Sequence, residues 1–95
     1  MASIVVDGLV VPISIGGHPA LDFCNTRAGR NGPRPKEYLL THAHLAVWAG
    51  HTGVVPHPDV AALRRAGRAD PVGAEQVLAR ALRLREALYL ALTGA

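Results

Sequence analysis

The sequence is poor in cysteine and in aromatic residues. Its 95 residues include a single cysteine, Cys24, which excludes an intrachain disulfide and a zinc site built from several cysteines of one chain. Only four side chains are aromatic, namely Phe23, Tyr38, Trp48 and Tyr89. Because proteins that bind single-stranded nucleic acid stack several bases on aromatic rings, we do not expect such a base-stacking surface here.

Long apolar runs and a strong charge of one sign are also missing. No stretch of about 18 apolar residues occurs, and no basic segment followed by an apolar one marks a signal peptide at the N-terminus. Ten basic and seven acidic residues give a net charge of +3, which by itself does not indicate a nucleic-acid site. We therefore expect a cytoplasmic protein that does not enter membranes.

The overall composition is that of a chain that folds, and we expect a single domain over residues 1–95. Apolar residues make up 49% and charged residues 18%, a balance typical of a folded chain. Asp7-Gly8 separates two β-branched runs within residues 3–15, which predicts a β-hairpin. Apolar spacing and capping residues predict four helices, at about residues 19–26, 41–50, 58–67 and 71–93. The predicted fold is α+β and mainly helical, with an N-terminal hairpin or two short strands followed by about four helices.

The last predicted helix, residues 71–93, carries an unusually wide apolar stripe. Its members are Val77, Leu78, Ala81, Leu82, Leu84, Leu88, Tyr89, Ala91 and Leu92. Three short helices and a hairpin are not expected to cover a stripe of this width. We therefore expect either a homo-oligomer formed through the apolar face of this helix, or a chain that is the front part of a longer protein.

Three segments resemble one known family. Residues 16–26 read Gly-Gly-His-Pro-Ala-Leu-Asp-Phe-Cys-Asn-Thr, residues 45–49 read Leu-Ala-Val-Trp-Ala before Gly53, and residues 84–88 read Leu-Arg-Glu-Ala-Leu. This arrangement is similar to the N-terminal part of the ABATE domain of bacterial stress-induced transcription regulators, where a Gly-rich entry precedes a Leu-Asp-x-x-Asn-Thr core and a Leu-x-x-Trp helix. The resemblance covers roughly residues 14–92.

The resemblance implies a regulatory protein and not an enzyme. In the family a zinc finger with a Cys-Gly-Asn-Arg signature follows the domain and is taken to bind DNA, and this sequence contains no such segment. DNA and zinc are therefore expected as partner and cofactor only of full-length relatives, and no cofactor is expected here. The chain is expected to be an N-terminal fragment of the ABATE-like regulatory domain, acting as its sensing or assembly region in transcription regulation.

Four residues are candidates for a ligand-binding or structural pocket: Asp22, Asn25, Thr26 and Trp48. Asp22 and Thr26 are four residues apart on the predicted helix, and Asn25 is expected on its inner face beside Leu21. Together they would form the polar floor of a pocket for an unidentified small molecule. In the structural alternative, Asn25 and Thr26 bond the backbone where the helix ends, and Trp48 belongs to the core.

Other interpretations remain open beside the regulatory one. An enzyme-like pocket for a small molecule or a metal could lie around Asp22 and Asn25, or the chain could be a purely structural dimerisation module. No catalytic motif occurs, and no histidine has Glu-x-x-His or His-x-x-x-His spacing, so no catalytic residue or metal ligand is predicted. In the predicted basic loop at 27–37, the candidates for phosphate contacts are Arg27, Arg30 and Arg34; otherwise their charges are simply solvated.

Overall fold

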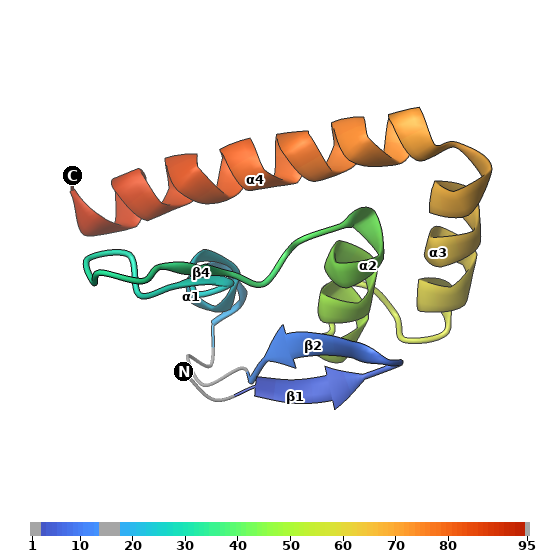
Figure 1. Ribbon diagram of the computed structural model, residues 1–95, viewed down its shortest axis with the longest axis horizontal. Helices are drawn as coiled ribbons and strands as arrows, with labels where there is room; N and C mark the ends of the chain where they lie inside the picture. Colours follow the sequence, from blue (N-terminus) through green and yellow to red (C-terminus); the bar gives the residue numbers. More distant parts are fainter. Residues whose placement is uncertain (1–2, 14–17, 95) are drawn as a thin grey trace.

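A computed structural model describes residues 3–13 and 18–94 of the chain. In order along the sequence, its elements are β1 (Ser3–Val6), β2 (Leu9–Pro12), α1 (Pro19–Cys24), β3 (Arg27–Ala28), β4 (Lys36–Glu37), α2 (His42–His51), α3 (Asp59–Ala69) and α4 (Pro71–Thr93). The prediction of a mainly helical α+β fold with an N-terminal hairpin and four helices is confirmed (Figure 1). Residues 14 and 15 of the predicted strand region, and the two glycines after them, lie outside the described residues.

The N-terminal hairpin forms where the sequence predicts it. Strands β1 and β2 pair antiparallel, with Val6 opposite Leu9 at the turn. The two turn residues have positive φ, 50° at Asp7 and 81° at Gly8. Asp-Gly suits this two-residue turn because its twist matches that of the strands it joins. The hairpin places Val11, which is fully buried, against the helices.

Helix α1 is shorter than predicted, and the segment after it is partly ordered into strands. The helix ends at Cys24, with Asn25 as its C-cap. Residues 27–37, predicted as a basic loop, begin and end in a second two-stranded sheet in which Arg27 pairs with Glu37. Strands of two residues carry no readable alternation of apolar and polar side chains, so the sequence pattern did not indicate them. This sheet brings Glu37 next to the end of α1.

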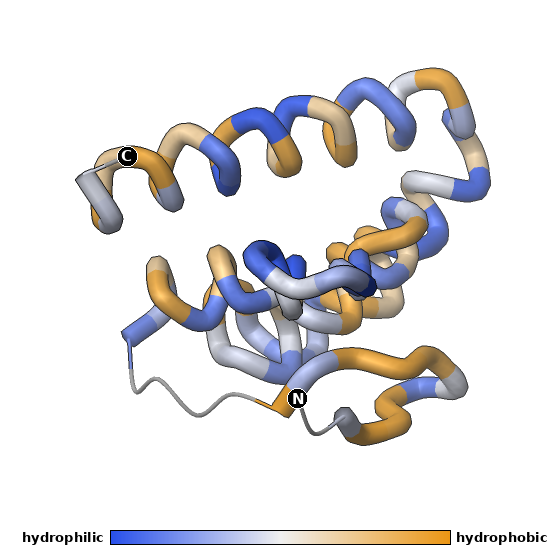
Figure 2. Tube along the Cα trace, turned by 60° about the vertical axis from the view of Figure 1, so that its left-hand side comes forward, coloured by the Kyte–Doolittle hydropathy of each residue, from blue (hydrophilic) through white to orange (hydrophobic). Residues whose placement is uncertain are grey.

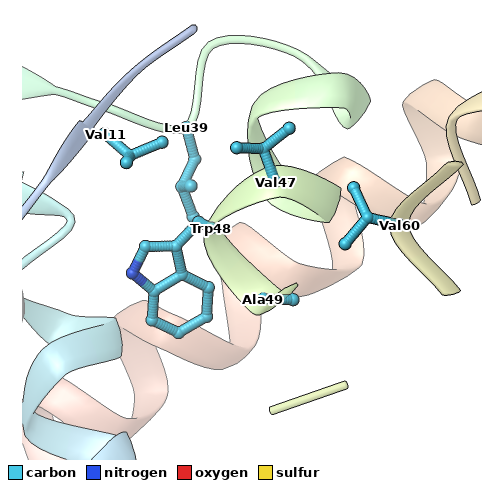
Figure 3. Close-up of a cluster of buried hydrophobic side chains, with 6 residues drawn as sticks. All are labelled: Val11, Leu39, Val47, Trp48, Ala49 and Val60. Atoms are coloured by element: carbon cyan, nitrogen blue, oxygen red, sulfur yellow. The ribbon is translucent and has the colours of Figure 1, made fainter. Parts of the chain in front are cut away.

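The hydrophobic core lies around helix α2. The Thr41 side chain caps this helix by accepting a hydrogen bond from the backbone N–H of His44 at 3.3 Å. Figure 3 shows the buried cluster that the helix organises, which consists of Val11, Leu39, Val47, Trp48, Ala49 and Val60. Helices α2 and α3 approach so closely at Gly50 that a Cβ there would overlap the Val60 side chain. The core is therefore small, aliphatic and closely packed, with one tryptophan.

Helix α4 runs the length of the molecule, from α3 at one end to α1 and β4 at the other (Figure 1). Its start is defined by Asp70, whose side chain accepts a hydrogen bond from Gly73 N–H at 3.0 Å. Figure 2 shows apolar segments recurring along the helix. Only part of this stripe is covered: Leu78 and Leu82 pack against the core, while other members remain exposed. Within the described ranges, none of the helices has the length and apolar character needed to cross a bilayer.

Candidate functional site

The most completely buried charged side chain in the described structure belongs to Arg85 of α4, which is 2% exposed. Its Nη1 and Nη2 donate to the two carboxylate oxygens of Glu37, each at 2.6 Å. Nη1 also donates to the hydroxyl oxygen of Thr26 at 3.2 Å, and Nε donates to Glu86 at 2.8 Å. This two-pronged bonding is the geometry in which guanidinium and carboxylate groups match best. It fixes α4 to the second sheet and to the end of α1.

A second arginine extends the same arrangement toward the surface. Both terminal nitrogens of Arg30 bond the Glu86 carboxylate, and Nη2 also donates to the carbonyl oxygen of Cys24 at 3.0 Å. The guanidinium carbon lies 4.0 Å from the centre of the Tyr89 ring, within the range of a cation–π contact. We call Thr26, Arg30, Glu37, Arg85 and Glu86 the arginine network.

The arginine network shifts the pKa of two of its members. Desolvation of Arg85 opposes its charged form, but the hydrogen bonds that it donates to Glu37 and Glu86, together with their negative charges, outweigh this effect. The pKa of Arg85 is therefore raised. The hydrogen bond from Arg30 is the main reason that the pKa of Glu86 is lowered to about 2, and Arg85 adds to the effect. Arg85 and Glu86 therefore remain charged throughout the physiological pH range.

We expect acid to weaken the fold partly through Glu86. Its pKa is lowered from 4.5 to about 2 in the folded chain, so the unfolded chain takes up this proton first. The contribution of the carboxylate is therefore complete above the ordinary value and is lost as the pH falls toward 2. The Glu86→Gln variant should show a smaller drop in Tm between about pH 5 and pH 2 than the unchanged protein, measured by circular dichroism. Glu75→Gln, an exposed glutamate of the same helix, should leave the drop unchanged; an equal effect of both variants would contradict the assignment.

The four predicted pocket residues separate into two places. Thr26 is fully buried and belongs to the arginine network, where its hydroxyl also donates to the carbonyl oxygen of Phe23 at 2.6 Å. Asp22 is 9% exposed on the inward side of α1. The expectation that Leu21 and Asn25 face inward is wrong, because Leu21 is 44% exposed and Asn25 is exposed as well. The buried residues of α1 are Asp22 and Cys24, so these two residues form its inner face.

Trp48 lies elsewhere, in the core and at the edge of an apolar cavity. Its ring is 4% exposed and stacks on Phe23, with the ring centres 5.4 Å apart. The cavity beside it has a volume of about 310 Å³ and is lined by Pro19, Ala20, Phe23, Leu45, Trp48, Ala49, Val54 and Leu84. Asp22, Asn25 and Thr26 do not line this cavity, so the predicted residues do not share one pocket floor.

The three basic residues predicted to contact phosphate have different surroundings. Arg30 is engaged by Glu86 and is only 14% exposed at its side chain. Arg27 is half-buried in the second sheet, and Arg34 is exposed in the turn of that sheet. Arg34 is therefore the member of this set that is best placed for a phosphate contact, which remains a prediction.

A second, larger cavity lies between helices α2, α3 and α4. Its volume is about 540 Å³, and its lining residues are Leu40, Thr41, His42, Ala43, Arg64, Gly67, Arg68, Pro71, Ala74, Glu75 and Leu78. Burial lowers the pKa of the nearby His44 imidazole, and the charge of Arg64 lowers it further. In the sequence Arg64 and Arg68 form a basic cluster whose charges are either solvated or available for phosphate contacts. Nothing along the chain indicates that α4 folds back beside them.

The histidines and acidic residues do not form a metal centre in the part of the chain that is described, since no group of three such side chains could hold an ion. The family model ABATE, described as "Putative stress-induced transcription regulator", matches residues 17–95. Neither a curated protein nor a solved structure matches the chain. The family match includes the arginine network and both cavities. The chain therefore belongs to the ABATE family.

Proposed function

We propose that this domain is the non-catalytic sensing and assembly region of a transcription regulator, and that it assembles by self-association through helix α4. In this proposal DNA is contacted by another segment of full-length relatives. The observation that carries it is the apolar surface that α4 leaves uncovered: Val77 is 45% exposed and Leu84 is 56% exposed. Apolar side chains gathered on one exposed face are typical of interaction surfaces.

The spacing of apolar side chains that are exposed or half-buried on α4 favours a second helix of the same kind as the partner. Val77, Ala81, Leu84, Leu88 and Ala91, which we call the outer seam, follow one another at intervals of four, three, four and three residues. Intervals of this kind repeat every 3.5 residues on average, the period at which two helices pack side chains into each other along a seam. Because each copy of the chain has the same outer seam, a homodimer buries the apolar side chains of both copies at once.

The surroundings of the outer seam support the same proposal. Leu84 also lines the apolar cavity beside Phe23 and Trp48, so the uncovered apolar surface continues from α4 onto α1 and α2. The next residue, Arg85, is held inward by Glu37. Since adjacent residues on a helix point about 100° apart, anchoring Arg85 inward places Leu84 at the edge of the buried face, where it borders this cavity and remains 56% exposed.

The test is the mass of the protein in solution, measured by sedimentation equilibrium at micromolar concentrations. We expect a dimer for the unchanged chain and a monomer for Leu84→Glu. A symmetric dimer places one carboxylate from each copy in the apolar interface. A loss of at least about 2 kcal/mol per side chain therefore adds up to about 4 kcal/mol, which weakens dimerisation by about 700-fold or more. Leu90→Glu is the matched control, because Leu90 is 50% exposed on the same helix but lies outside the outer seam. A monomeric unchanged chain, or equal dissociation of both variants, would sink the proposal.

A further inference from the structure

The cavity between α2, α3 and α4 has the size and lining of a site for a small organic molecule. Its volume of about 540 Å³ falls within the range of pockets that hold such molecules. Three helices contribute to its wall, and Pro71, Ala74 and Leu78 come from α4. Leu40 and Ala43 add further apolar surface from the start of α2. One part of the wall therefore suits an apolar chain.

The α3 side of the same cavity is cationic. Arg64 and Arg68 are four residues apart, so they lie on one face of α3, and both line the cavity. Among the described residues, neither forms an ion pair with an acidic side chain. Arg64 donates one long hydrogen bond, 3.4 Å from Nη1 to the carbonyl oxygen of Asp7, and its Nε is buried without an acceptor among the described groups. Two arginines that have no acidic partner among the described residues therefore line the cavity together with its apolar wall.

The remaining charges at the cavity decide how much negative charge it can take. Glu75 is the acidic residue of the lining, and it is exposed. Two arginines and one glutamate leave a net charge of one positive unit at the cavity, which matches an anion with a single charge better than a doubly charged phosphate. A carboxylate also fits the flat, two-pronged donor geometry of a guanidinium group.

We infer that this cavity binds a small organic monocarboxylate, with its apolar chain against Leu40, Ala43, Pro71 and Leu78 and its carboxylate at Arg64 and Arg68. None of the residues that line this cavity belongs to the outer seam, although Val77 of the seam lines the adjoining hollow. Ligand binding and self-association are measured by separate experiments, so one proposal can fail without the other.

The experiment is a calorimetric titration of the full chain with octanoate, with octanamide and with inorganic phosphate. Octanoate and octanamide have the same chain length, so the difference between them isolates the carboxylate charge. We expect octanoate to bind at least about tenfold more tightly than octanamide, and phosphate to bind more weakly than octanoate. Arg68→Met should reduce the preference for octanoate over octanamide, because it removes one of the two positive charges and keeps the apolar stem.

Arg65→Met is the matched control, since Arg65 is an exposed arginine of the same helix that does not line the cavity. It should leave the preference for octanoate unchanged. The inference is overturned if octanoate does not bind at millimolar concentration, if it binds no more tightly than octanamide, or if phosphate binds as tightly. Equal losses in Arg65→Met and Arg68→Met would also overturn it, because they would indicate attraction by the overall charge of α3.

Discussion

Replacing Arg85 by methionine is expected to lower the free energy of unfolding by about 3 kcal/mol. The side chain is 2% exposed, and its loss leaves Glu37 without its two-pronged partner and Thr26 without a donor. Removing one partner of a buried pair costs about 3–5 kcal/mol, and the lower value applies here because Glu37 retains some contact with water. For a domain of this size the change corresponds to a decrease in Tm of roughly 10–20 °C, measured by thermal circular dichroism.

Arg83→Met provides the control for this prediction. Arg83 is an exposed arginine of the same helix, and its replacement should change the stability by less than about 0.5 kcal/mol. Adding Glu37→Gln to Arg85→Met should restore part of the lost stability, since the carboxylate left without a partner is then removed as well. Equal Tm values for the Arg83 and Arg85 variants would contradict the role assigned to the arginine network.

The Trp48→Ala variant is expected to lose about 3–5 kcal/mol. Trp48 is 4% exposed, stacks on Phe23 and borders the apolar cavity, so the void left by the indole adjoins space that is already empty. The total stability of a small domain is only about 5–15 kcal/mol, so the variant should be close to unfolding at room temperature. Urea titration followed by far-ultraviolet circular dichroism measures the loss, because the only tryptophan of the chain is absent from the variant.

Trp48→Phe is the conservative comparison. An aromatic ring at this position can still stack on Phe23, so it should retain about half of the lost stability or more. If Trp48 served a ligand site without supporting the core, Trp48→Ala would unfold at nearly the same urea concentration as the unchanged chain, and the core assignment would be wrong.

The candidate site could be predicted only in part from the sequence. Thr26 and Trp48 were selected, since a polar residue at a helix end and a tryptophan at helical spacing are visible locally. Arg85 and Glu37 were missed because they are 48 residues apart in the chain. The residues around each of them do not indicate which residue it pairs with. Asn25 was placed on the wrong face because the prediction took the side of Leu21 as the inner one, whereas Asp22 and Cys24 are the buried residues of α1.

Features that depend on neighbouring residues could be predicted from the sequence alone. Asp7-Gly8 specified the hairpin turn, Thr41 and Asp70 specified two helix starts, and the apolar spacing along residues 71–93 specified an amphipathic helix. These features follow from backbone geometry and from hydrogen bonds that span only a few residues.

Tertiary structure decided which part of the apolar stripe is covered and which charges are buried. Helix α4 has more apolar surface than the small core can use, so its rotation about its own axis is not defined by hydrophobicity alone. The bonds from Arg85 to Glu37 and Thr26 settle that rotation: they turn Leu78 and Leu82 toward the core and leave Leu84 exposed. Such pairing brings together residues far apart in the chain, and it is decided only when the helices pack.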